Sequence, residues 1–149
     1  MTAWEEARDG GAEAEWTILH DRNEANQLAA IARCELLNRQ RRKSLIRYDF
    51  VAEPAWDMLL ALYVSRHARQ PIDVESLCLA AAAASTTALR SIGLLVEMKL
   101  IDWSHSGVGE RDVDIALSDE GAAEIESYLR DILHRVQLGR DVADRAPKG

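Results

Sequence analysis

The stretch that decides the fold is residues 73–98, DVESLCLAAAAASTTALRSIGLLVEM. Asp73 can cap a short helix over residues 74–81, because its carboxylate accepts hydrogen bonds from the free N–H groups of a first helical turn. After the alanine run, the Ser-Thr-Thr of residues 85–87 is expected to cap a second, amphipathic helix. A short helix, a tight turn and a second helix together predict a helix-turn-helix over about residues 74–98.

The second helix of this motif is expected to bury one face and to expose the other. We take Leu89 as the centre of the buried face. The 100° helical step then places Ser85, Ile92 and Val96 beside it. The same step turns four residues outward, namely Thr87, Arg90, Ser91 and Leu94. The polar members of this outer face are therefore candidates for contact with a partner.

A two-stranded ribbon is predicted directly after the helix-turn-helix. Residues 100–103 read as a strand, and residues 113–117 alternate between apolar and polar as a half-buried strand does. Between these strands, Gly107 and Gly109 are typical of a flexible hairpin tip. The ribbon, about residues 100–117, is therefore predicted to be the wing of a winged helix-turn-helix.

Further helices are expected on both sides of this unit. Apolar residues recur at helical spacing over about residues 21–44, and they do so again over about residues 119–138. Ser118 is placed to cap the second of these helices. Another helix starts at Pro54, because proline is well accommodated in a first helical turn. Ile72, just before the helix-turn-helix, is expected to form a very short strand by itself.

The two ends of the chain carry little that a core could bury. Residues 1–16 are acidic and contain a Gly-Gly pair, so they are predicted to be a flexible tail, and residues 139–149 are predicted to be a C-terminal tail. The sequence thus predicts one mainly α domain over residues 17–138, with a small β-wing and long N- and C-terminal dimerisation helices.

Composition excludes several classes of protein. The 149 residues are 48% hydrophobic and 29% charged, as in a soluble globular domain. No apolar run approaches the roughly 20 residues needed to span a bilayer, and the acidic N-terminus lacks a secretory core, so we expect a cytoplasmic protein with no membrane partner. Cys34 and Cys78 lie far apart and are expected to be buried apolar residues, with a redox-sensing thiol as the alternative.

The formal net charge of -7 is unevenly distributed along the chain. Residues 1–32 carry -5 and residues 112–149 carry -4, whereas residues 33–111 carry +2. A phosphate backbone responds to the local patch rather than to the total charge. The middle of the chain can therefore still bind DNA, although the electrostatic attraction is modest.

The order of the elements resembles that of the MarR family of bacterial regulators, and four segments carry the resemblance. PAWDMLL at 54–60 resembles a helix start in one branch of that family, and TTALRSI at 86–92 resembles its recognition helix. LVEMKLI at 95–101 lies where the family has a pattern like L-E-x-x-G-L-V. LSDEG at 117–121 matches the L-T/S-x-x-G that follows the wing. The resemblance covers about residues 20–138.

The resemblance implies a homodimer whose interface is formed by the helices at about 21–44 and 119–138. It implies a recognition helix in the major groove of double-stranded DNA and a wing on the backbone or in the minor groove. Many members of the family also bind a small effector between the dimer helices and the DNA-binding lobe, and the sequence names no effector for this chain.

The chain departs from the family pattern at three positions around the wing. Lys99 replaces a glycine, which is a poorer fit if the backbone there needs a positive φ. Trp103 replaces a basic residue at the end of the first wing strand. Arg111 is kept from the family's D-x-R, but Gly109 stands where the aspartate would orient it.

The candidate DNA-contacting residues lie on the second helix and around the wing. Arginine can bond two acceptors on guanine, and hydroxyl groups can reach phosphates or base edges. The candidates are Ser85, Thr86, Thr87, Arg90 and Ser91 on the helix, and Lys99, His105 and Arg111 around the wing. The alternative for each is a capping or solvated surface role. The basic cluster RQRRK at residues 39–43 is expected to be a solvated helix end, with a DNA-facing patch as the alternative.

No pattern in the sequence supports catalysis. The four histidines are scattered, with no HExxH motif and no Cys/His ligand spacing, so neither a metal nor a cofactor is expected. Trp16, Trp56 and Tyr63 could line an effector pocket, but aromatic residues at helical spacing are expected to be core residues.

We therefore expect a dimeric, sequence-specific DNA-binding transcription regulator that is not an enzyme. The alternative is a winged helix retained as a protein-interaction module, such as an adaptor or anti-repressor, with weak or no DNA binding. The acidic arms, Lys99 and Trp103 favour that alternative. A third hypothesis keeps DNA binding but places it under the control of an effector. The sequence identifies neither the operator nor whether the output is repression or activation.

Overall fold

The computed structural model describes residues 10–45, 53–105 and 113–147. In these ranges the chain is mainly helical with a small antiparallel sheet, as the sequence predicts. The helices are α2 (Gly11–His20), α3 (Glu24–Leu45), α4 (Pro54–Ala68), α5 (Val74–Ala81), α6 (Ser85–Glu97) and α7 (Asp119–Arg145). The strands are β1 (Ile72–Asp73), β2 (Ile101–His105) and β3 (Val113–Leu117).

The three strands form one antiparallel sheet in the order β1-β3-β2. β2 and β3 pair along their whole length, with Ile101 opposite Leu117 at one end. β1 adds two residues, with Ile72 opposite Ile115. The strand predicted at residues 113–117 and the very short strand predicted at Ile72 are both confirmed.

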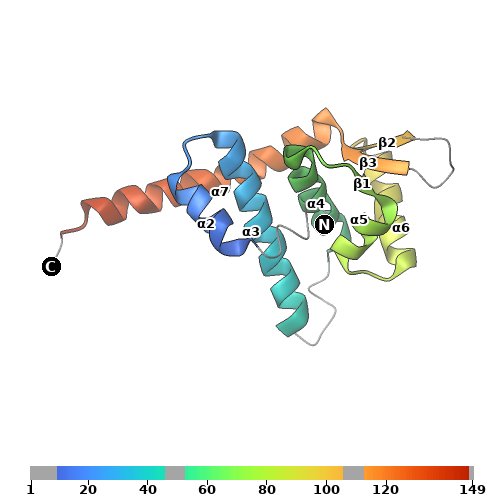
Figure 1. The fold of residues 1–149 in the computed structure, drawn as a ribbon, viewed down its shortest axis with the longest axis horizontal. Coiled ribbons are helices and arrows are strands. Elements are labelled where there is room, and N and C mark those ends of the chain that lie inside the picture. Colours follow the sequence, from blue (N-terminus) through green and yellow to red (C-terminus); the bar gives the residue numbers. More distant parts are fainter. Residues whose placement is uncertain (1–9, 46–52, 106–112, 148–149) are drawn as a thin grey trace.

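α4 is the helix around which the other elements pack. It contacts α3, α5, α6, α7 and β3. Its residues Met58, Leu60 and Val64 are fully buried. Figure 1 shows α5, α6 and the sheet together at one end of the molecule, whereas the C-terminal half of α7 extends away at the other end. The segments expected to contact DNA are therefore gathered in one part of the fold.

α5 and α6 are joined by the three residues 82–84, and their axes are bent by 108°. Asp73 caps α5 as predicted, because its carboxylate accepts a hydrogen bond of 2.7 Å from the Ser76 N–H. The Ser-Thr-Thr cap predicted for α6 is wrong. The helix already begins at Ser85, and Ala84 occupies the cap position without a side-chain hydrogen bond.

In the described ranges, no single helix is long and apolar enough to cross a membrane. α5 and α6 meet that test of length and composition only when they are taken together as this bent pair.

The buried face of α6 differs from the predicted face. Ala88, Ile92 and Leu95 are buried, whereas Leu89, the predicted centre of that face, is 55% exposed. Apolar residues recur at helical spacing on both faces, so periodicity alone does not select one of them. α6 packs against α4, and a small residue such as Ala88 allows two helix backbones to approach closely. Leu89 is consequently turned to solvent.

Both ends of the chain contain more helix than predicted. α2 begins at Gly11, so the predicted tail is wrong for residues 11–16, while residues 1–9 lie outside the described ranges. Its Ala14 is buried, and the helix packs on α3, so tertiary contact stabilises a segment whose composition resembles a tail. α7 continues to Arg145 instead of ending at about residue 138.

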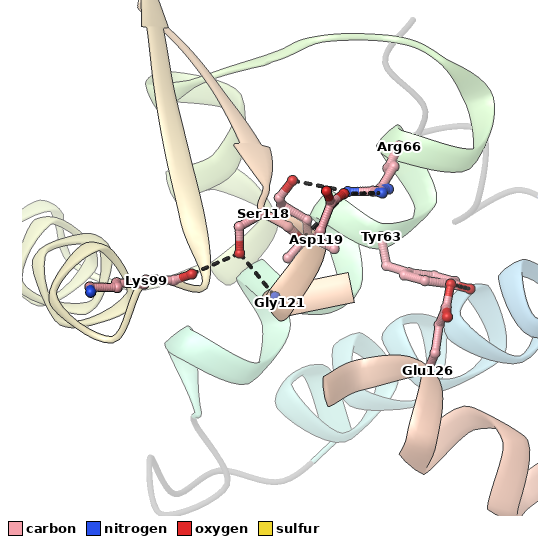
Figure 2. Close-up of polar contacts among 8 residues, drawn as sticks. Tyr63, Arg66, Lys99, Ser118, Asp119, Gly121 and Glu126 are labelled. Carbon is pink, nitrogen blue, oxygen red and sulfur yellow. Dashed lines mark hydrogen bonds and ion pairs between the residues drawn. The ribbon is translucent and has the colours of Figure 1, made fainter. Parts of the chain in front are cut away.

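A junction of backbone and hydroxyl groups joins the end of α6 to the start of α7. Ser118 caps α7 as predicted, accepting from the Gly121 N–H at 2.9 Å, and its hydroxyl donates to the Lys99 carbonyl at 2.7 Å (Figure 2). The Ser118 N–H donates to the Leu100 carbonyl at 3.0 Å. Lys99 has a φ of 59°, so the backbone at this position does adopt the positive φ that favours glycine.

Two side chains of α4 hold the start of α7 against the core. The Arg66 guanidinium donates to the Leu117 carbonyl at 3.1 Å and pairs with the Asp119 carboxylate at 2.9 Å. Tyr63 donates to Glu126 at 3.2 Å (Figure 2). Burial, together with the negative charge of Glu126, raises the pKa of Tyr63 above its ordinary value.

The substitution Gly121→Ala is expected to destabilise the protein by about 2 kcal/mol or more. An added Cβ would lie 2.1 Å from the Leu100 carbonyl oxygen, so the backbone of the junction would have to move. The matched control is Gly139→Ala in the same helix, where an added Cβ meets nothing within 4 Å. The control is expected to stabilise the protein by roughly 0.5–1 kcal/mol, because alanine favours helix. Urea unfolding measures both changes, and a Gly121→Ala midpoint equal to that of the wild type would contradict the close approach.

Candidate nucleic-acid interface

α6 carries most of the predicted DNA-contacting residues. Four of them are exposed to solvent, namely Ser85, Thr86, Thr87 and Arg90. Ser91 is half-buried, and its hydroxyl donates to the Thr87 carbonyl at 3.0 Å. Because that hydroxyl already donates within the helix, Ser91 is less available to a partner than the other four residues.

Two leucines are exposed on the same helix. Leu94 is 50% exposed, as its predicted outward position requires, and Leu89 is 55% exposed against prediction. An apolar side chain on a DNA-reading helix can contact the methyl group of thymine. On a helix that binds another protein, the same side chains would become the apolar centre of the interface.

The predicted residues around the wing are only partly described. Lys99 is exposed at the corner between α6 and β2. His105 is the last residue of β2, and its side chain lies outside the described set. Arg111 falls in residues 106–112, outside the described ranges. Trp103, which stands where a basic residue was expected, is 44% exposed.

The basic cluster at residues 39–43 includes a buried ion pair. Arg39 is only 6% exposed; it pairs with the carboxylate of Asp57, which is 1% exposed, and its Nη1 lies 3.1 Å from Glu53. The predictions of a solvated helix end and of a DNA-facing patch are therefore both wrong for Arg39, which joins α3 to α4. Arg41, two residues further on, is exposed. Spacing could not reveal this pair, because its partners are 18 residues apart on different helices.

The substitution Arg39→Met is expected to destabilise the protein by about 3–5 kcal/mol, because it removes the guanidinium that is paired with the buried Asp57 carboxylate. Arg41→Met makes the same chemical change on an exposed position of the same helix. It is expected to cost less than about 1 kcal/mol. Urea unfolding compares the two variants. If both unfolded at the same urea concentration, the buried pair would not be holding α3 to α4.

The three aromatic residues considered for an effector pocket do not share one site. Trp16 is 59% exposed and stacks on His20, so it is not the core residue that was expected. Tyr63 is buried, as expected. Trp56 packs edge-on against Tyr128, with 5.1 Å between ring centroids. Trp56 also lines a cavity of about 710 Å³ between α4, the end of α6 and the start of α7, which neither of the other two residues lines.

Both cysteines are free and half-buried. Burial raises the pKa of Cys34, and the carboxylates of Glu15 and Glu35 raise it further. Burial also raises the pKa of Cys78. A higher pKa lowers the fraction of thiolate, which is the reactive form. These surroundings favour a packing role for both cysteines over redox sensing.

The part of the chain around α5 and α6 is not basic. Residues 72–103 contain two cations, Arg90 and Lys99, against four carboxylates. Electrostatic attraction of this stretch to phosphates is therefore weak. In the described ranges, no group of three or more metal-ligating side chains comes together.

Comparison of the chain with protein-family models, with curated proteins and with solved structures finds no match. The functional proposal therefore rests on the geometry of the described residues and on the motifs in the sequence.

Proposed function

We propose that the chain is a dimeric, sequence-specific DNA-binding transcription regulator of the MarR-type winged helix-turn-helix class, and not an enzyme. The observation that carries the proposal is the 108° bend between α5 and α6 across a three-residue turn. Two helices at about 90–120° with such a turn are typical of the DNA-binding helix-turn-helix. In this proposal α6 enters the major groove, and the hairpin of β2 and β3 touches the backbone or the minor groove.

The exposed face of α6 has side chains suited to reading bases. Arg90 can donate two hydrogen bonds to one guanine, and Thr86 and Thr87 can bond phosphates or base edges. Leu89, exposed beside them, can pack on a thymine methyl group. The proposed contacts therefore combine one charged group with short polar and apolar groups.

The weak local charge determines how such a protein would bind. Each phosphate contact contributes roughly -0.9 to the slope of the logarithm of the binding constant against the logarithm of the salt concentration. Few cations are present to make such contacts. Non-specific binding is therefore expected to be weak at physiological salt. Specificity then depends on base contacts and on DNA shape.

A dimer is supported by the apolar side chains exposed on α2 and on the second half of α7. They are Trp16, Leu19, Leu138 and Val142. Arg140 of α7 donates a hydrogen bond to the Leu19 carbonyl of α2, so the two helices lie next to each other. We infer that a second copy covers the side of α7 that carries Leu138 and Val142 in a two-fold interface. In such a dimer the two α6 helices would be spaced by one DNA turn, about 34 Å.

The double substitution Leu138→Glu and Val142→Glu is expected to convert the dimer to a monomer, because it places two carboxylates in the centre of the proposed interface. Sedimentation velocity measures the change in mass. The matched control is Leu79→Glu, whose side chain is 62% exposed on α5, the helix that Figure 1 shows at the opposite end of the molecule from the C-terminal half of α7. The control is expected to remain dimeric. Persistence of the dimer in the double variant would contradict the proposed interface.

A second candidate function is favoured by the apolar surface of α5 and α6. Leu79, Leu89, Leu94 and Met98 are each at least half exposed. Together with the four carboxylates of residues 72–103, such a surface also suits another protein. In this second proposal the winged helix is a protein-interaction module with weak or no DNA binding.

Selection of genomic DNA fragments by the purified protein at low salt separates the two proposals. A regulator is expected to enrich a motif with two-fold symmetry, and Arg90→Ala is expected to abolish the enrichment. The matched control is Arg145→Ala, which removes the same charge from the exposed end of α7 and is expected to leave the motif unchanged. Absence of any enriched motif with the wild-type protein would reject sequence-specific DNA binding and favour the protein-interaction module.

A further inference from the structure

The cavity that Trp56 lines, between α4, the end of α6 and the start of α7, has a volume of about 710 Å³. This volume is within the range typical of small-molecule sites, roughly 300–1,000 Å³. Its lining includes Trp56, Leu59, Met98, Leu100, Glu120 and Glu124. The α6 residues assigned to DNA contact do not line it, and the exposed residues of the proposed dimer interface do not either. The cavity is therefore a separate feature of the fold.

Apolar side chains from two elements present part of their surface to the cavity. Trp56 and Leu59 are three residues apart on α4, so they lie on the same side of that helix. Both are half-buried, as is Leu100. Met98, at the end of α6, is 56% exposed. The core thus leaves apolar surface here that a ligand can cover.

Two carboxylates lie on the side of α7 that faces this apolar surface. Glu120, Glu124 and Tyr128 follow one another at intervals of four residues, so they lie along one side of the helix. Tyr128 meets Trp56 edge-on, with 5.1 Å between ring centroids. The side that carries the two glutamates is therefore the side turned toward Trp56. Both glutamates are exposed, and both line the cavity.

The protein does not neutralise these two charges. Across the described ranges, no ion pair or hydrogen bond joins the side chain of Glu120 or Glu124 to another residue. The described residues that line the cavity include no lysine, arginine or histidine. Two like charges one helical turn apart destabilise a helix slightly. A cation bound beside both carboxylates would relieve that repulsion.

Charge and apolar surface together restrict the ligand. An anion would be repelled by both carboxylates. An uncharged apolar molecule would cover the apolar surface but leave the two carboxylates unpaired. The ring of a tryptophan such as Trp56 also attracts cations. A molecule with a positive group and an apolar body complements both parts of the cavity.

We propose that this cavity binds a small organic cation with an aromatic or aliphatic body. The positive group of the ligand lies beside Glu120 and Glu124, and its apolar body packs on Trp56, Leu59 and Met98. The proposal does not rest on DNA binding, because no residue assigned to base reading lines the cavity.

Isothermal titration of the full chain with two cations, phenylbutylamine and tetraphenylphosphonium, tests the site. We expect at least one of them to bind. Glu120→Gln and Glu124→Gln, combined in one variant, are expected to weaken its binding at least fivefold, because they remove both charges and keep the shape of the side chains. Both positions are exposed, so the variant is expected to fold, and thermal unfolding verifies that it does.

The matched control is Glu13→Gln, which removes an exposed carboxylate from the first turn of α2. It is expected to bind the cation as the wild type does. Absence of binding by both cations would overturn the proposal. An unchanged affinity in the double variant would also overturn it, since the carboxylates would then take no part.

Anions of matching shape test the role of charge. Phenylbutyrate is the counterpart of phenylbutylamine, and tetraphenylborate is the counterpart of tetraphenylphosphonium. The counterpart of the cation that binds is expected to bind at least tenfold more weakly. Equal binding of cation and anion would contradict recognition of a positive group.

Met98 reports where the ligand binds. The chain has three methionines, so their methyl resonances can be resolved by NMR after labelling of the methyl carbon. Met98→Leu identifies the resonance of Met98 by its loss. This resonance is expected to shift when the wild-type protein is saturated with the cation. Binding that leaves it in place would locate the ligand elsewhere and overturn the proposed site.

Discussion

The close contact between Gly121 and the Leu100 carbonyl sets the position of the elements around it. The Ser118 hydroxyl accepts from the Gly121 N–H and donates to the Lys99 carbonyl, and the Ser118 N–H donates to the Leu100 carbonyl. These short contacts leave no room for a side chain at Gly121 and fix the start of α7 against the end of α6. Arg66 adds α4 to the same junction. The direction of α6, and hence the direction of its exposed face, follows from this arrangement.

The proposed regulator combines a suitable geometry with a weak electrostatic attraction. The bend between α5 and α6 and the exposed Arg90 support DNA reading, whereas the four carboxylates of residues 72–103 oppose strong binding to phosphates. A protein of this kind discriminates mainly through the few groups that contact bases. The same balance explains why the apolar surface of α5 and α6 supports an interaction module as the second candidate. Both functions would use α6, and the exposed Leu89 would take part in either of them.

Local signals in the sequence predicted the elements that depend on neighbouring residues. The caps at Asp73 and Ser118 and the strand at residues 113–117 follow from residue types within one or two turns. At Lys99, where φ is positive, the pattern that the sequence resembles has a glycine. The features that were missed depend on distant partners. The buried state of Arg39 requires Asp57 on another helix, and the face of α6 that is buried depends on its contact with α4. α2 likewise requires α3, because a helix of 10 residues is only marginally stable by itself. For the candidate site, the sequence identified the polar face of α6 but not the exposure of Leu89.

Site-specific photocrosslinking tests most directly whether α6 is the element that meets DNA. A benzophenone amino acid replaces Thr87 in one variant and Leu138 in another, and each protein is irradiated with sheared genomic DNA at low salt. We expect DNA adducts from position 87, and adducts to a second copy of the chain from position 138. Protein adducts without DNA adducts from position 87, or DNA adducts from position 138 alone, would contradict this expectation.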